Sequence, residues 1–112
     1  MISIEIFRDK DQNITGLLSI GHADYAESGS DVICAAVSML VINSLNAIEK
    51  FSNTKAVLKN EDQEKGVIDV EFESIPDEKA QTILDTMLLG LNDVIRTYGK
   101  KYLRLTDTLG RR

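Results

Sequence analysis

The chain has 112 residues, enough for one compact domain and too few for two independent hydrophobic cores. Hydrophobic residues make up 43% and charged residues 28%, a composition that excludes a disordered or collagen-like chain. The formal net charge of −5 disfavours nucleic acid as the primary partner, and a basic protein or peptide is electrostatically easier to bind.

The first 21 residues predict a β-hairpin. Ile2, Ile4 and Ile6 alternate with other residues over 2–7, which is the pattern of a half-buried strand. A polar turn over 8–13 follows, and the run 14–20 is expected to pair with the first strand in the antiparallel direction. Small residues over 24–30 then predict a loop.

A long helix is predicted from Val32 to about Phe51. Asp31 stands before it as the N-cap, because its carboxylate can accept a hydrogen bond from a free amide of the first turn. Apolar residues lie on most sides of this helix. We therefore expect the helix either at the centre of the core or shared with a second subunit.

The second half of the chain repeats the order strand, strand, helix. Residues 54–59 alternate weakly and residues 67–73 cleanly, with an acidic hairpin loop over 60–66 between them. A second helix opens at 76–78, and Gly99 can end it. Its apolar stripe, with a period of 3.6 residues, comprises Ala80, Ile83, Leu84, Met87, Leu88, Leu91, Val94, Ile95 and Tyr98.

The chain ends in a tail whose structure is less marked. A further short strand can form over 102–105, and the polar residues 106–112 are expected to fray. The order ββαββα, with this optional C-terminal strand, predicts one α+β domain over residues 1–112. We expect two layers, an antiparallel sheet with two helices packed on one face.

The sequence favours the cytoplasm. A single cysteine cannot form an internal disulfide, which fits a reducing compartment. The N-terminus lacks the basic and apolar regions of a secretion signal. The longest apolar run, Val37 to Ile42, is broken by Ser38 and is short for a membrane-spanning helix. We therefore expect no membrane contact.

Two kinds of site have little support. The chain contains neither of the glycine-rich phosphate-binding motifs, and one histidine with one cysteine cannot supply a structural zinc site. The acidic run 60–64 could offer carboxylates to Mg²⁺ or Ca²⁺, but its spacing fits no known loop motif. We interpret it as the solvated tip of a hairpin.

His22 and Cys34 are the only residues of their kinds, and they lie close in the sequence. Cys34 is predicted in the first turn of the long helix, where partial positive charge and unpaired amides favour a thiolate and can face a developing oxyanion. His22 follows a strand end and Gly21, so its imidazole could reach that turn as a base and then as an acid.

Each of these residues also has a purely structural interpretation. A cysteine in an apolar helix is most often a small core residue, and a histidine after a strand usually makes a structural hydrogen bond. An N-cap role explains Asp31 without chemistry, and Ser38 can bond back to a helix carbonyl. From the residues alone, the catalytic and the structural interpretations both stay open.

The stretch 21–38 resembles the ribosomal-processing cysteine protease family of Firmicutes and related bacteria. The family signature, Gly-His-Ala and then Gly-x-Asp-x-[Val/Ile]-Cys-Ala-Ala-Val-Ser, matches residues 21–23 and 29–38 without a departure. The likeness extends over nearly the whole chain, through its length, its first strand, its hairpin and its second amphipathic helix.

This resemblance implies a small homodimeric cysteine endopeptidase for which no metal or organic cofactor is expected. Members remove a short N-terminal extension from the large-subunit ribosomal protein twenty-seven, cutting after a hydrophobic, aromatic-rich segment. By the same resemblance Cys34 is the nucleophile, His22 is the general base and Asp31 assists. The mobile substrate site that it implies includes Gly21, Ala23, Gly29, Ser30 and Ser38.

An alternative from another class is a non-enzymatic ribosome-assembly module that binds a basic protein tail through its acidic surface. Cys34 would then be a buried residue without a chemical role. A thiol redox protein is less well supported, because no resolving cysteine is present. Fast alkylation of Cys34 at neutral pH would favour the enzyme, and slow alkylation would favour the assembly module.

Overall fold

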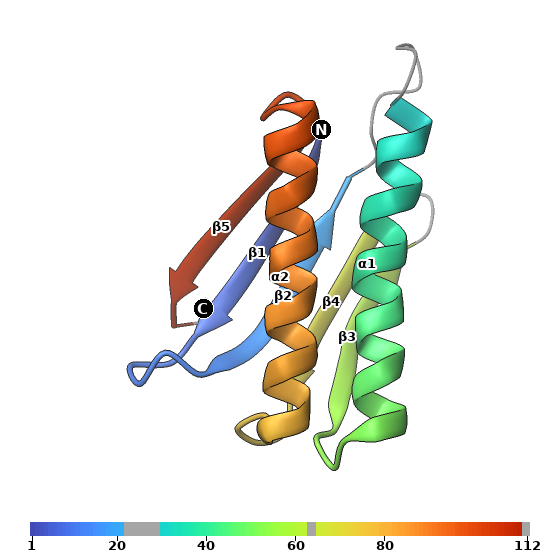
Figure 1. The fold of residues 1–112 in the computed structure, drawn as a ribbon. Helices are drawn as coiled ribbons and strands as arrows, with labels where there is room; N and C mark the ends of the chain where they lie inside the picture. The colour runs from blue at the N-terminus through green and yellow to red at the C-terminus, as the bar shows by residue number, and fades with distance from the viewer. Residues whose placement is uncertain (22–29, 63–64, 111–112) are drawn as a thin grey trace.

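The structure is a computed structural model that describes residues 1–21, 30–62 and 65–110. Both helices lie side by side on one face of a five-stranded sheet (Figure 1). The predicted α+β fold in two layers is therefore confirmed. The elements, in chain order, are β1 (Ile2–Arg8), β2 (Ile14–Ile20), α1 (Ser30–Phe51), β3 (Ala56–Asp62), β4 (Val67–Phe72), α2 (Glu78–Tyr98) and β5 (Leu103–Leu109).

The sheet is mixed, with the strand order β3-β4-β2-β1-β5. The pairs β1–β2, β2–β4 and β3–β4 are antiparallel as predicted, but β5 runs parallel to β1, with Leu103 opposite Ile2. The prediction of a purely antiparallel sheet is therefore wrong. Strands β4 and β5 point the same way, and parallel strands need a crossover, which α2 supplies. The amide of Ile2 donates to the carbonyl of Tyr102 at 2.9 Å where β5 begins.

Two segments predicted as loop or tail are strands. Strand β3 continues to Asp62, so most of the acidic run pairs with β4 instead of forming the tip of the hairpin, although Asn60 and Glu61 are exposed as predicted. Strand β5 continues to Leu109, so the residues from 106 to 109 do not fray. The Arg8 Nε contacts the Asp107 Oδ1 at 2.9 Å, and the hydroxyl of Thr108 donates to the carboxylate of Glu5 at 2.5 Å. These polar residues have partners on β1 that are distant in the sequence.

Helix α2 follows the prediction at both ends. The Oδ1 of its N-cap, Asp77, accepts from the amide of Ala80 at 2.9 Å. At the other end Gly99 has a φ of +95° and donates its N–H to the carbonyl of Ile95 at 2.7 Å. The predicted stripe faces the core except at its last residue, Tyr98, which is exposed because the helix ends there.

Helix α1 begins at Ser30, so Asp31 lies within its first turn and is not the N-cap that the sequence predicts. An acidic residue is favourable in the first turn as well, because it interacts with the positive end of the helix dipole. The helix turns one side to the core, where Val37, Val41 and Ile48 are buried, so it is apolar on more sides than the core covers. Its outer side leaves Val32 and Met39 exposed.

Residues Val32–Phe51 of α1 are also long and apolar enough to cross a membrane by length and composition. The length of the longest apolar run understates this helix, because its average hydropathy stays high across interruptions such as Ser38, Asn43 and Ser44. Core helices pass the same test. Because α1 is apolar on most of its sides and the core covers only one of them, its outer side exposes apolar residues to solvent.

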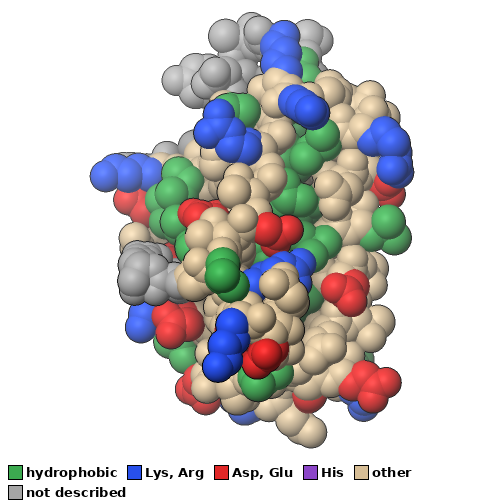
Figure 2. Space-filling view, turned by 90° about the vertical axis from the view of Figure 1, so that its left-hand side faces the viewer, with side chains coloured by type: hydrophobic (Ala, Val, Ile, Leu, Met, Phe, Trp, Pro, Cys, Tyr) green, Lys and Arg blue, Asp and Glu red, His purple; other side chains and the backbone are tan. Residues whose placement is uncertain are grey.

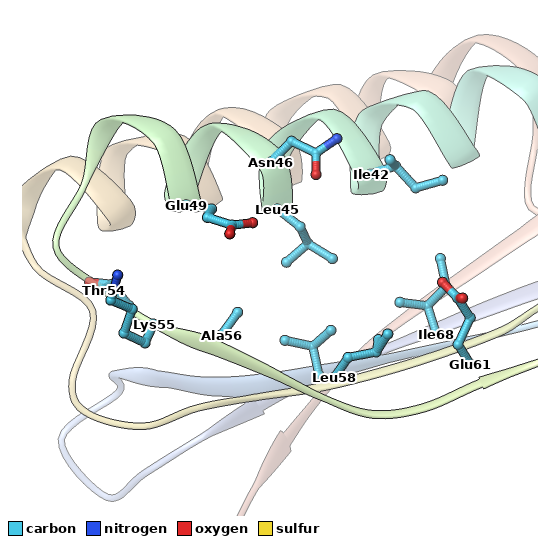
Figure 3. A pocket seen from close by; sticks show the side chains of 11 residues that line it. Ile42, Leu45, Asn46, Glu49, Thr54, Lys55, Ala56, Leu58, Glu61 and Ile68 are labelled. Atoms are coloured by element: carbon cyan, nitrogen blue, oxygen red, sulfur yellow. The ribbon is translucent and has the colours of Figure 1, made fainter.

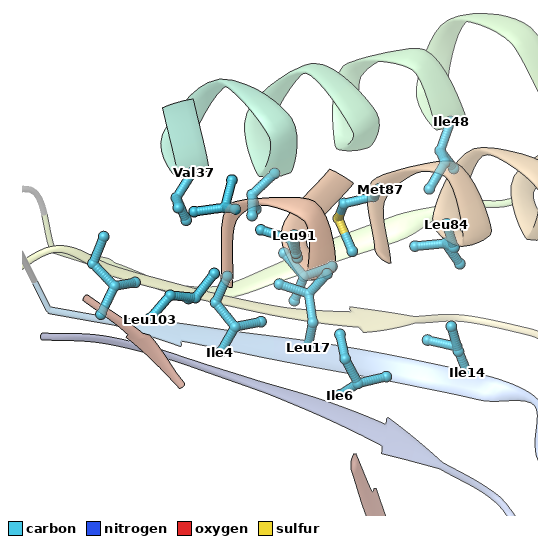
Figure 4. Close-up of a cluster of buried hydrophobic side chains, with 14 of the residues drawn as sticks. Ile4, Ile6, Ile14, Leu17, Val37, Ile48, Leu84, Met87, Leu91 and Leu103 are labelled. Atoms are coloured by element: carbon cyan, nitrogen blue, oxygen red, sulfur yellow. The ribbon is translucent and has the colours of Figure 1, made fainter. Parts of the chain in front are cut away.

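The core fills the space between the sheet and the two helices (Figure 4). Side chains from β1, β2 and β5 meet those of α1 and α2, and their burial is the main driving force for this arrangement. The innermost residues, each no more than 2% exposed, include Ile4, Ile6, Leu17, Val37, Val41, Ile48, Leu84, Met87, Leu91 and Leu103. This core fixes α1 beside α2 on the sheet.

Candidate active site

Gly21 fixes the point at which the chain leaves β2. Its φ is +103°, a region that favours glycine. Its N–H donates to the carbonyl of Gly66 at 3.1 Å. A Cβ at this position would lie 2.7 Å from the carbonyl oxygen of Met1, which is too close. The position therefore requires glycine, and the residue that precedes His22 has a defined place.

Cys34 is the fifth residue of α1 and begins its second turn, two residues further into the helix than predicted, because the helix starts at Ser30 and not at Val32. The free amides of the first turn therefore belong to residues that precede Cys34. The thiol side chain is half-buried and packs against the edge of the core. Cys34 is thus not the fully buried core residue of the structural interpretation.

Three predicted site residues, His22, Ala23 and Gly29, lie outside the described residues. Ser30 and Asp31 belong to the first turn of α1, and their side chains also lie outside the description. The predicted pairing of His22 with Cys34 and the assisting role of Asp31 therefore stay predictions.

Gly21 and Ser38 border the same cavity, of about 200 Å³. Ser38 follows Cys34 by four residues, so the two lie on neighbouring turns of one helix face. Gly21 directly precedes His22 in the chain. The end of β2 and the start of α1 also lie at the same end of the molecule (Figure 1). The fold thus brings the attachment point of His22 and the helix turn next to Cys34 to one cavity.

A second cavity, of about 270 Å³, lies further along α1, between this helix and strands β3 and β4. The two cavities share Ile42, Glu61 and Ile68 in their linings, so they adjoin along α1. Figure 3 shows Leu45 and Leu58 in the space between the helix and the strand, with Glu61 beside Ile68. We call the two cavities together the α1–β3 groove, lined by Gly21, Ser38, Val41, Ile42, Leu45, Glu49, Lys55, Leu58, Glu61, Asp62 and Ile68, among others.

The groove residues on β3 and β4 are not among those that the sequence predicts for the site. The alternation over 67–72 places Ile68 on the same face as Val70, and this signal could have identified it as an inward residue. Glu61 gave no such signal, because its orientation depends on an irregularity in the pairing of β3 with β4. When the partner strand is not known, the sequence of a charged strand looks the same as that of a solvated turn.

The chain is similar to known proteins over nearly its whole length. Residues 1–103 match the model of a family described as cysteine protease Prp. The ribosomal processing cysteine protease Prp of Bacillus subtilis (strain 168) is 33% identical over 113 residues, which cover 97% of this chain and 99% of the relative.

Two crystal structures of the ribosomal processing protease Prp from S. aureus have the same fold. The complex with a covalently linked product peptide has a TM-score of 0.85 and 30% sequence identity. The complex with a substrate peptide has a TM-score of 0.86 and 29% identity. Each comparison covers 96% of this chain and 100% of the other.

Proposed function

The chain belongs to the cysteine protease Prp family and is a cysteine peptidase, and from this premise we propose a specific reaction. It removes the N-terminal extension from the precursor of large-subunit ribosomal protein twenty-seven, cutting after a hydrophobic, aromatic-rich segment. The relatives named as ribosomal processing proteases support this substrate class. The substrate and product peptides bound to the S. aureus protein support a peptide as the substrate.

The proposed mechanism uses Cys34 as the nucleophile and His22 as the general base. The thiolate attacks the carbonyl carbon of the bond to be cut, while the imidazole holds the thiol proton and then passes it to the leaving amine. Water hydrolyses the resulting thioester, and the imidazole now accepts the proton of the water. Asp31 would assist by orienting or stabilising the imidazole. No metal or organic cofactor takes part in these steps.

One observation carries this mechanism. The residue before His22 and the residue one turn after Cys34 border the same cavity, so the two proposed catalytic residues are attached to neighbouring parts of the fold. The half-buried state of Cys34 supports a thiol that a substrate can reach. The net charge of −5 favours the approach of a basic ribosomal protein.

A peptide cleavage assay tests the proposed function. A synthetic peptide that covers the extension and the first residues of the precursor from the same organism is incubated with the wild type, Cys34→Ala and His22→Ala, and the products are identified by mass spectrometry. We expect the wild type to cut one bond and each variant to be slower by at least about a thousandfold.

Two results would contradict the proposal. Cleavage at the wild-type rate by Cys34→Ala would exclude the thiol as the nucleophile. Tight binding of the peptide without cleavage by any of the proteins would favour the assembly module instead. The circular dichroism spectra of the variants serve as the control for folding.

We further propose that the protein works as a homodimer in the cytoplasm, with contact through the outer side of α1. No charged residue occurs between Asp31 and Glu49, and Val32 and Met39 are exposed there. The side of the molecule that faces away from α1 instead shows acidic and basic side chains together (Figure 2). An uncharged helix side on an otherwise charged protein is the kind of surface that a second copy can cover. The net charge argues against nucleic acid as a partner. We propose that a second copy of the chain, and not a membrane, covers the apolar outer side of α1.

A further inference from the structure

We propose that the α1–β3 groove binds the apolar residues that precede the cleavage site, and that Glu61 selects a basic side chain among them. The proposal rests on the proposed function, because it assigns the subsites of the same reaction. The occupant is therefore an extended, mainly apolar peptide segment that carries a positive charge.

The groove has the length of a short peptide. Ser38 and Glu49 border it at its two ends and are eleven residues apart on α1, which corresponds to about 16 Å along the helix axis. An extended chain advances by about 3.3 Å per residue, so this length holds about five residues. Because Cys34 lies about 6 Å before Ser38, the bound segment begins about two residues from the scissile bond and ends about seven residues from it.

The walls of the groove leave apolar surface in contact with water. Ile42 on α1 is 42% exposed and Leu58 on β3 is 52% exposed, and both line it. Leu45 and Ile68 continue the apolar lining between them (Figure 3). Apolar side chains of α1 face those of β3 and β4 across a gap. Such a gap can bind an apolar segment of another molecule.

A β-bulge turns Glu61 into the groove. Leu58 lies opposite Val70, but after the irregularity Glu61, and not Asn60, lies opposite Ile68. Residues directly opposite each other point to the same face of a sheet, so the extra residue, Lys59, moves Glu61 to the face of α1. Without the bulge an uncharged amide would occupy this place.

The carboxylate of Glu61 is available to a ligand. It makes no hydrogen bond or ion pair with another residue that the structure describes. Glu49 and Asp62 also line the groove, and Lys55 is the one basic residue among its described lining residues. The charge of the lining is therefore negative, which complements a cation and disfavours an acidic segment. This complementarity is our reason for assigning a basic side chain to the apolar occupant.

A lysine scan of the substrate tests this inference. Synthetic peptides based on the precursor extension carry one lysine at each of positions two to seven before the scissile bond, and kcat/KM is measured for each. We expect the wild type to prefer lysine at one position by about three- to tenfold. Glu61→Gln should abolish the preference, and Glu61→Lys should transfer it to a glutamate at that same position.

Matched variants control for charge and for loss of apolar surface. Glu71→Lys makes the same charge change on β4 at a position that does not line the groove, and it should keep the preference for lysine. Ile42→Ser should lower kcat/KM for all the apolar peptides by about tenfold, because it removes groove surface. Leu89→Ser, on the exposed side of α2, should leave kcat/KM unchanged.

The outcomes separate this inference from the proposed function. If the wild type cleaves none of the peptides, the proposed function fails. If cleavage depends on Cys34 but Glu61→Lys and Ile42→Ser keep the wild-type kcat/KM for every peptide, the groove assignment fails and the function stands. If Ile42→Ser changes the oligomeric state, a second copy covers the groove and the assignment is likewise overturned.

Discussion

Asp77 connects the end of α1 to the start of α2. Its carboxylate accepts from the amide of Ala80 at 2.9 Å and from the amide of Asn53 at 2.8 Å, and its own N–H donates to the hydroxyl of Thr54. The two amides, that of Ala80 first, hold the pKa of Asp77 below its ordinary value. Ionised Asp77 therefore stabilises the folded chain more than the unfolded chain.

This connection predicts a pH-dependent loss of stability in Asp77→Ala. The folded pKa lies below the unfolded value of about 3.9, so the contribution of the carboxylate is fully present above that value and is lost as the pH falls through the folded pKa. We expect the variant to melt several degrees lower at pH 7, with a gap that narrows in acid below about pH 4. Thermal unfolding followed by circular dichroism at a series of pH values measures this gap.

The control for this prediction is Asp85→Ala, because Asp85 is exposed within α2 and makes no hydrogen bond with another described residue. It should melt within a degree or two of the wild type. A gap for Asp77→Ala that stays constant into strong acid would show that packing, and not the ionised carboxylate, is lost.

At the scale of residues, the sequence identifies positions better than it identifies their partners. Cys34 stands out as the one cysteine of the chain and Gly21 by its place after a strand, and the structure gives each a defined place. The exact turn of Cys34 depends on where α1 begins, which is a balance between local caps that several residues near 30 can satisfy. The distance from His22 to Cys34 depends on residues 22–29, which lie outside the described residues, and no local pattern encodes it.

At the scale of elements, substitutions in β5 can test whether the C-terminal strand belongs to the core. Leu103 is 1% exposed at the start of this strand, whereas Leu109 is 69% exposed at its end. We expect Leu103→Ala to lower the free energy of unfolding by about 2–4 kcal/mol, because it leaves a cavity beside β1. Leu109→Ala removes the same atoms from the surface and should change it by less than about 0.5 kcal/mol.

Denaturant unfolding of both variants measures these two free energies. A loss for Leu103→Ala as small as that for Leu109→Ala would mean that β5 is not a stable part of the sheet. In that case the fraying tail that the sequence predicts would be the better description.

Helix α2 could be predicted with both of its ends, since its apolar period and its caps are local properties of the chain. The ends of β3 and β5 could not, because polar residues become strand residues only when a partner strand is beside them. The partner of β5 is β1, about a hundred residues away in the sequence. The bulge that orients Glu61 likewise exists only in the pairing of β3 with β4.

At the scale of the whole molecule, the direction of β5 follows from connectivity. Once β1, β2 and β4 pair in the antiparallel direction, β4 is parallel to β1, and a helix as long as α2 returns the chain to the end where β1 begins. The last strand must then run parallel to β1. The two layers and the placement of the helices can be predicted without this step, because amphipathic periods define faces but not strand order.

The proposed homodimer is also a property of the whole molecule, and Met39 offers a test of it. Met39 on α1 is 61% exposed and Leu89 on α2 is 64% exposed, so the two form a matched pair. We expect the wild type to have twice the mass of one chain in light scattering after size exclusion. Met39→Lys should be a monomer, because a dimer contact would bury an unpaired charge, at a cost of several kcal/mol. Leu89→Lys should remain a dimer. A dimer that survives Met39→Lys, or one that dissociates with Leu89→Lys, would move the contact away from α1 and leave its uncharged side for another partner.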